Sequence, residues 1–110
     1  MRVTQSILSW IHKQIEDMTH TERKTLLQGL IAATFTPLSH NGELNLDQIP
    51  PVVDHLLASG VAGMYVLGST GEGPSLTVDE RQCVAEAFVA VADGRLPVVI
   101  QVGCESLNQA

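Results

Sequence analysis

Short apolar runs recur along the chain at residues 31–36, 64–67 and 98–102, and two amphipathic patterns separate them. Runs of this length are typical of strands that are buried on both faces. The alternation of strand and helix favours parallel strands joined by right-handed crossover connections. The pattern therefore predicts an α/β fold in which about three parallel strands form one sheet.

The first amphipathic segment has apolar residues at the helical spacing of three and four: Ile49, Val52, Val53, Leu56 and Leu57. We predict a helix that ends at Gly60, since glycine suits the left-handed position that follows a helix. The start of this helix has two readings. A capping box of Asn45 and Gln48 is one; the other is Asp47 as N-cap, which brings the following Pro-Pro pair closer to the first turn.

The second amphipathic segment opens with Thr77 and Glu80 at the spacing of a capping box, which predicts the N-terminus of a helix. Gly94 is expected to close this helix before the third strand. Its buried stripe is expected to consist of Val84, Ala85, Phe88, Val89 and Ala92.

Residues 1–28 form a separate segment, which we interpret as an amphipathic helical extension that precedes the α/β part at residues 29–110. We favour an ordinary packed helix here; a helix that caps the open end of the fold or binds a partner is the alternative. The apolar face of this helix would comprise Ile7, Leu8, Ile11, Ile15 and Met18.

Composition narrows the class of protein. An apolar fraction of 45% and a mean hydropathy of +0.17 over 110 residues are typical of one globular domain. The net charge of −6 argues against nucleic acid or an anionic membrane as a partner. No apolar run approaches the ~20 residues of a membrane span. Cys83, Cys104 and the four histidines lack metal-ligand spacing, so we expect no metal site and a cytoplasmic chain with reduced thiols.

The most informative polar segment is residues 68–72, GSTGE, which directly follows the second apolar run. Ligands of parallel α/β folds bind at the carboxyl ends of strands, where this segment is predicted to lie. Gly68 and Gly71 would let backbone N–H groups approach a ligand, and Ser69 and Thr70 add two hydroxyl donors. The segment therefore predicts a site for a small carboxylate or phosphate.

Two nucleotide-binding motifs were compared with this segment. A Walker loop would end in Gly-Lys-Ser/Thr, and no lysine follows here. In a dinucleotide loop the third glycine would fall at Pro74, and the helix would open on the loop rather than at Thr77. A nucleotide-binding α/β domain and a glycine-rich turn without a ligand both stay open as minor alternatives.

Several segments together resemble the dihydrodipicolinate synthase/N-acetylneuraminate lyase family of pyruvate-dependent class I aldolases. They are GLIAATFTP at residues 29–37, NGE at 41–43, VDHLL at 53–57 and GSTGEGPSLTVDER at 68–81. The resemblance covers about residues 29–110, and the stretch GEGPSLTVDERQCVAEAF is more similar to the N-acetylneuraminate lyases of the family.

This resemblance implies the N-terminal part of a (β/α)8 TIM barrel and Schiff-base lyase chemistry without an external cofactor. In the family, a lysine on the sixth strand condenses with pyruvate and a tyrosine on the fifth strand shuttles protons. Ser69 and Thr70 would bind the pyruvate carboxylate, and Thr36, Gly68 and Gly71 would line the same cavity. The implied partner is pyruvate or a pyruvate-containing sugar acid such as a sialic acid, and a full-length form could be a homo-oligomer.

The chain departs from the family in its catalytic residues. Its two lysines, Lys13 and Lys24, both precede the first predicted strand, and Tyr65 lies inside the second. We therefore expect no catalytic residue in this chain; the lysine and the tyrosine would lie beyond residue 110. The sequence predicts an N-terminal fragment of a lyase that is inactive alone. A non-catalytic module that pairs with an intact family member is the alternative.

Overall fold

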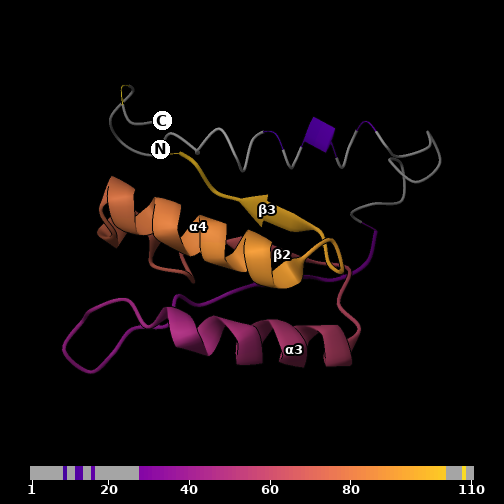
Figure 1. Cartoon of the computed structure of the whole chain (residues 1–110), viewed down its shortest axis with the longest axis horizontal. Helices are drawn as coiled ribbons and strands as arrows, with labels where there is room; N and C mark the ends of the chain where they lie inside the picture. The colour runs from indigo at the N-terminus through magenta and orange to yellow at the C-terminus, as the bar shows by residue number, and fades with distance from the viewer. Residues whose placement is uncertain (1–8, 10–11, 14–15, 17–27, 104–107, 109–110) are drawn as a thin grey trace.

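The computed structural model describes residues 28–103, together with residues 9, 12, 13, 16 and 108, and residues 28–103 form an open α/β unit (Figure 1). Three parallel strands lie in the order β1-β2-β3. This arrangement confirms the predicted fold class. In chain order the elements are β1 (Ile31–Ala33), the 3₁₀ helix η1 (Leu46–Gln48), α3 (Ile49–Ser59), β2 (Gly63–Val66), the 3₁₀ helix η2 (Gly73–Ser75), α4 (Val78–Ala92) and β3 (Val98–Ile100).

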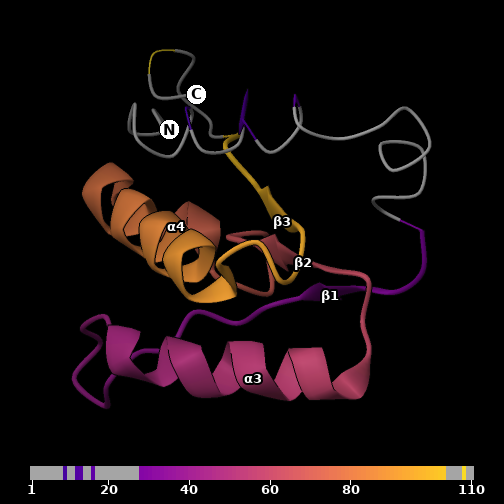
Figure 2. The same cartoon turned by 45° about the vertical axis from the view of Figure 1, so that its right-hand side comes forward.

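The core lies where α3 and α4 pack against each other and against the sheet (Figure 2). The predicted stripe of α4 is buried as expected, and β2 contributes apolar side chains from the centre of the sheet. Burial of these side chains is the main favourable term that holds the layers together. The largest fully buried side chains are those of Phe88, Ile49, Met64, Leu67, Val53, Val66 and Val84.

The ends of the helices follow local sequence chemistry, with two exceptions: the start of α3, and the end of α4, where Asp93 with φ of 46° is the C-cap in place of the predicted Gly94. The capping box of Thr77 and Glu80 is present in both directions, and Gly60 ends α3 with φ of 75°. At the start of α3 both predicted caps are wrong: the turn η1 leads into the helix, and Gln48 is its N-cap without a side-chain hydrogen bond. Since two prolines occupy the first turn, fewer backbone N–H groups need a cap there.

β1 and β3 are shorter than the apolar runs predicted, and β2 has the predicted length but begins and ends one residue earlier. Leu67 has φ of 66°, so the chain turns away from the sheet directly after β2. Thr34 still donates its backbone N–H to the Tyr65 carbonyl at 3.0 Å. Because the chain turns away at Leu67, the residues after Thr34 have no continuing β2 strand to pair with. Gln101 likewise donates to the Val66 carbonyl at 2.9 Å, and the chain then leaves the sheet. The three parallel strands therefore end level with one another, and their carboxyl ends lie on the same side of the sheet.

The predicted helical extension lies mostly outside the described residues, and so do all five residues of the apolar face predicted for it. Lys24 and Cys104 also lie outside the described residues. Of the extension's described residues, those at positions 9, 12, 13 and 16 are helical and exposed, and the His12 Nε2 atom lies 2.8 Å from Glu16 Oε1 one turn later. The separate segment at residues 1–28 therefore stays a prediction. Within the described part of the chain, no helix is long and apolar enough to cross a membrane.

Candidate functional site

The candidate site is the turn that follows β2. It begins at Leu67, a non-glycine residue in the left-handed region with a fully buried side chain. The next residue, Gly68, lies against the ring of Tyr65, because a Cβ at this position would be 2.4 Å from the Tyr65 Cε1 atom. Only glycine lets the chain pass this ring without displacing it. Tyr65 is thus a half-buried packing residue beneath the turn.

Two further glycines fold the turn back onto its own start. A Cβ at Gly73 would lie 2.0 Å from the Leu67 carbonyl oxygen, and a Cβ at Gly71 would lie 3.1 Å from the Leu67 nitrogen. Gly73 also donates its N–H to the Gly68 carbonyl at 3.2 Å. Backbone contacts and a hydrogen bond therefore fix both ends of the turn, independently of any ligand.

Ser69 and Thr70 are the exposed residues between these fixed ends. Within the described part of the chain, no side chain or backbone group hydrogen-bonds to either hydroxyl. The Ser69 carbonyl is occupied, because it accepts from Glu72 N–H at 3.1 Å. Two free hydroxyl donors on a rigid turn can bind an anionic oxygen with little loss of conformational entropy.

Thr36 is buried behind this turn. Its Oγ1 donates to the Gly71 carbonyl oxygen at 2.5 Å, across 35 positions of sequence. Its hydroxyl therefore holds the turn. That Thr36, Gly68 and Gly71 also line a substrate cavity stays a prediction, as does the binding role of Ser69 and Thr70.

Arg81 is a further residue near the carboxyl ends of the strands. The sequence analysis did not single it out. Its side chain is only 3% exposed, and Nη2 donates to the carbonyls of Gln101 at 3.2 Å and Gly103 at 2.9 Å. Among the described residues no carboxylate pairs with it, and its Nε has no hydrogen-bond partner. The signal was available, since Arg81 extends the buried stripe of α4 by three residues toward the helix N-terminus.

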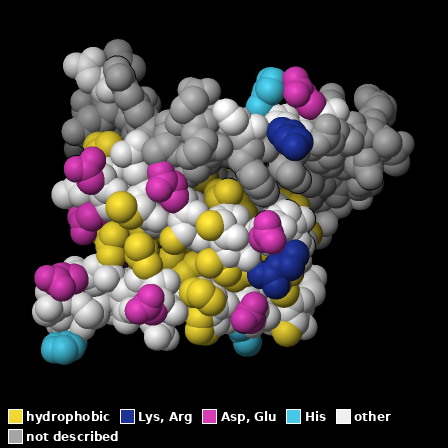
Figure 3. Space-filling view, in the orientation of Figure 1, with side chains coloured by type: hydrophobic (Ala, Val, Ile, Leu, Met, Phe, Trp, Pro, Cys, Tyr) yellow, Lys and Arg dark blue, Asp and Glu magenta, His cyan; other side chains and the backbone are white. Residues whose placement is uncertain are grey.

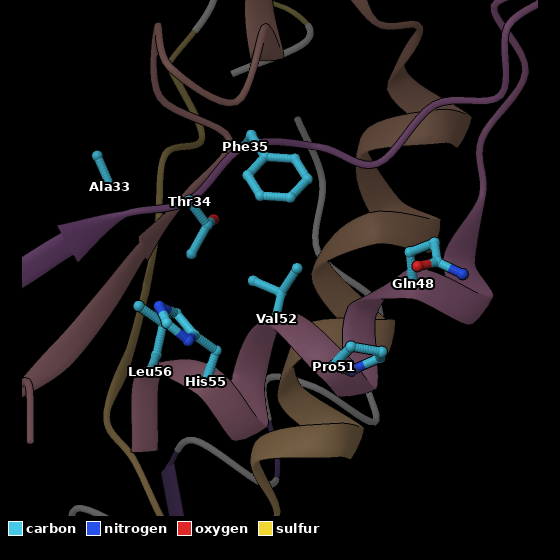
Figure 4. Close-up of a pocket in the computed structure, with 8 residues that line it drawn as sticks. All are labelled: Ala33, Thr34, Phe35, Gln48, Pro51, Val52, His55 and Leu56. Carbon is cyan, nitrogen blue, oxygen red and sulfur yellow. The ribbon is translucent and has the colours of Figure 1, made fainter. Parts of the chain in front are cut away.

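A separate groove lies between the end of β1 and α3 (Figure 4). It has a volume of about 390 Å³, and Thr34 and Phe35 lie across from the helix residues Val52 and His55. Neither Ser69 nor Thr70 lines it. The remaining lining residues are Ala33, Gln48, Pro51 and Leu56. Within the described residues, no group of His, Cys, Asp and Glu side chains could hold a metal ion.

A parallel sheet with a hydroxyl-bearing turn at the carboxyl end of a central strand defines the class of α/β proteins that bind small ligands at strand ends. A comparison with protein families gives the particular family. Residues 26–110 match the dihydrodipicolinate synthetase family, and the chain belongs to that family. The predicted family is thereby confirmed.

Similar proteins are lyases and synthases of this family. The chain is 49% identical over 86 residues to N-acetylneuraminate lyase of Xenopus tropicalis, an alignment that covers 76% of this chain and 28% of the relative. The solved Proteus mirabilis N-acetylneuraminate lyase superposes with a TM-score of 0.72 at 44% identity, covering 74% of this chain and 28% of that one. Dihydrodipicolinate synthase from Acinetobacter baumannii, solved in complex with pyruvate, gives a TM-score of 0.71 at 26% identity, with 76% and 28% covered.

The chain thus spans less than a third of the length of these relatives. The three strands and two helices match the N-terminal part of the TIM-barrel fold that these neighbours share. In that fold the carboxyl ends of the strands carry the active site, which is the edge where the turn at residues 68–72 lies.

Proposed function

We propose that this chain supplies the pyruvate-carboxylate-binding part of a Schiff-base lyase, with Ser69 and Thr70 as the binding residues. The observation that carries the proposal is the pre-formed turn with two exposed, unbonded hydroxyls at the carboxyl end of β2. The names of its relatives support the same chemistry: several are N-acetylneuraminate lyases, and one synthase was solved with pyruvate bound.

The physical role of the turn is to bind and to orient. Each hydroxyl can donate one hydrogen bond to a carboxylate, and a bond to a charged acceptor is worth about 1.5–3 kcal/mol. A carboxylate fixed in this way holds the neighbouring keto carbon in position for attack by an amine. This orientation lowers the entropic cost of reaching the transition state in the complete barrel enzyme. In this proposal the substrate is a sialic acid, and its pyruvate portion is the part that the turn holds.

The amine itself would come from elsewhere in the barrel. Lys13 is exposed and helical, and it precedes β1 in the chain rather than following a strand. We propose that the Schiff-base lysine and the proton-shuttling tyrosine are supplied by later barrel strands, beyond residue 110. The amine would attack the keto carbon with loss of water, and the resulting imine would accept the electron pair of the carbon–carbon bond that breaks.

A chimaera tests this proposal. Residues 26–110 of this chain would replace the matched segment of the Xenopus tropicalis lyase, and cleavage of N-acetylneuraminate would be measured. We expect activity, and we expect Ser69→Ala with Thr70→Val to lower kcat/KM by roughly 100-fold or more, as loss of two charge-assisted bonds requires. Ser75→Ala is the matched control, because Ser75 is an exposed serine of the adjoining turn η2. An active chimaera that tolerates the double substitution would argue against the proposal.

A second candidate is a non-catalytic module that pairs with an intact family member. The observation that favours it is the outer edge of β1, which has no partner strand among the described residues. Leu30, just before β1, is 80% exposed, and Phe35, which lines the groove of Figure 4, is 54% exposed. An unpaired strand edge with apolar side chains readily accepts a further strand. Co-purification with a full-length family member would support this candidate, and a stable monomeric chain that ignores such a partner would count against it.

A further inference from the structure

Thr36 connects the end of the first strand to the candidate site. It lies three residues after β1, is 5% exposed, and donates to the carbonyl of Gly71, which directly follows Thr70. A buried carbonyl without a partner costs about 1–3 kcal/mol, so this bond strongly favours one orientation of the peptide group after Gly71.

The strand end that carries Thr36 is itself fixed. Thr34 donates its N–H to the Tyr65 carbonyl at 3.0 Å, which ties the end of β1 to β2. A Cβ at Gly71 would lie 3.0 Å from the Thr34 carbonyl oxygen, a tight contact that glycine avoids, so the turn packs closely against the end of β1. Thr36 therefore acts from a rigid support on a segment that packs directly against it.

The Thr36 hydroxyl can hold the turn or donate a hydrogen bond to the substrate, but it cannot do both. A threonine hydroxyl has a single proton to donate, and that of Thr36 is committed to Gly71. A carboxylate only accepts hydrogen bonds, so the remaining lone pairs of Thr36 Oγ1 would repel it rather than bind it. Thr36 is thus poorly suited to touch the carboxylate, unlike the free hydroxyls of Ser69 and Thr70.

We propose that Thr36 is a positioning residue, whose buried hydroxyl orients the Ser69–Thr70 pair by holding the Gly71 carbonyl. The effect on catalysis rests on the proposed function, whereas the effect on the turn does not. Gly71 is the link between the two: it is close enough to β1 to accept the bond and adjacent in sequence to the residue that is oriented.

Three variants test the positioning of the turn in the full 110-residue chain. Thr36→Val keeps the shape but removes the donor, Thr36→Ser keeps the donor, and Thr34→Val is the matched control. Thr34 is an equally buried threonine whose hydroxyl points to Tyr65 rather than to the turn. Amide hydrogen exchange would be followed in peptides that cover residues 68–73 and, for the core, residues 84–92.

We expect Thr36→Val to speed exchange of the turn by roughly 5- to 20-fold, with the core peptide unchanged, because one buried bond is lost locally. Thr36→Ser should stay within about twofold of the parent chain, and so should Thr34→Val. Equal acceleration of turn and core, or no acceleration of either, would overturn the proposal. So would a Thr36→Ser variant that behaves like Thr36→Val.

The kinetic constants of the chimaera give a second test, because a residue that only stabilises the fold would not change KM. We expect Thr36→Val to raise KM about tenfold and Thr36→Ser to restore it, since a misdirected hydroxyl pair binds substrate less well. A fall in kcat at constant KM that matches a fall in the folded fraction would mean only a loss of folded enzyme and would contradict positioning. An inactive unsubstituted chimaera would bear on the proposed function, while the exchange experiment would still decide the role of Thr36.

Discussion

Gly73 packs directly on the carbonyl group of Leu67, such that a Cβ at position 73 would lie 2.0 Å from the Leu67 oxygen. No side chain fits in that space, and the group it would strike is backbone at the end of β2. The contact joins the two residues that flank residues 68–72 on either side. The apolar face between α3 and α4, where the acidic side chains lie only at the margin, is a separate surface (Figure 3).

Gly73→Ala is expected to destabilise the chain by about 1–3 kcal/mol, the usual cost of forcing an extra carbon into a packed site. Urea unfolding would measure this change. Gly103→Ala is the control, because a Cβ there would meet only the flexible side chain of Gln101, at 3.2 Å. Equal stabilities of the two variants would mean that the turn yields more readily than its contacts imply.

Leu67 should reverse the usual order of alanine and glycine. At an ordinary strand position glycine is less stable than alanine by roughly 0.5–1 kcal/mol. Leu67 has φ of 66°, where a side chain costs roughly 1–2 kcal/mol that glycine avoids. Both Leu67→Ala and Leu67→Gly lose the buried side chain, but we expect Leu67→Gly to be the more stable of the two by about 1 kcal/mol.

The matched pair for Leu67 is Val66→Ala and Val66→Gly, at the preceding residue inside β2. Here the normal order, with alanine more stable, is expected in the same denaturation experiment. If both positions gave the normal order, the left-handed conformation of Leu67 would be wrong.

Arg81 should act on the segment after β3. Arg81→Met removes the donor to the carbonyls of Gln101 and Gly103, and we expect a loss of about 1.5–3 kcal/mol, typical of buried bonds to a charged group. Arg81→Lys should recover only part of this loss, since one ammonium cannot reproduce the planar guanidinium. Urea unfolding gives the size, and hydrogen exchange at residues 101–103 gives the location.

Arg95→Met is the control for Arg81. Arg95 is exposed, lies 3.9 Å from Asp54 and donates to carbonyls at the end of α4, so its removal should cost clearly less. An Arg81→Met variant as stable as Arg95→Met would show that the buried guanidinium does not tie α4 to the end of β3.

The elements that the sequence predicted best depend on local chemistry. The capping box of Thr77 and Glu80 and the glycine end of α3 at Gly60 each need only neighbours in sequence, and both are present. The parallel order of strands followed from their alternation with helices. The family resemblance, carried by motifs such as GSTGE, was likewise readable without coordinates.

The features that the sequence did not predict depend on contacts between distant segments. The apolar run around Leu67 looked like continuous strand, because a leucine gives no local sign of a left-handed backbone. Burial of Arg81 depends on carbonyls 20 and 22 residues away. The bond from Thr36 to Gly71 spans 35 residues, so the threonine was predicted to line a cavity rather than to support the turn.

The most direct test of the central claim is borohydride trapping of the pyruvate Schiff base, followed by mass spectrometry. We expect no adduct on the 110-residue chain alone, whose lysines precede β1, and an adduct on the chimaera with the Xenopus tropicalis lyase. Ser69→Ala with Thr70→Val should strongly reduce trapping by the chimaera at limiting pyruvate, whereas Ser75→Ala should not. An adduct on the chain alone, or equal trapping with and without the two hydroxyls, would contradict the account.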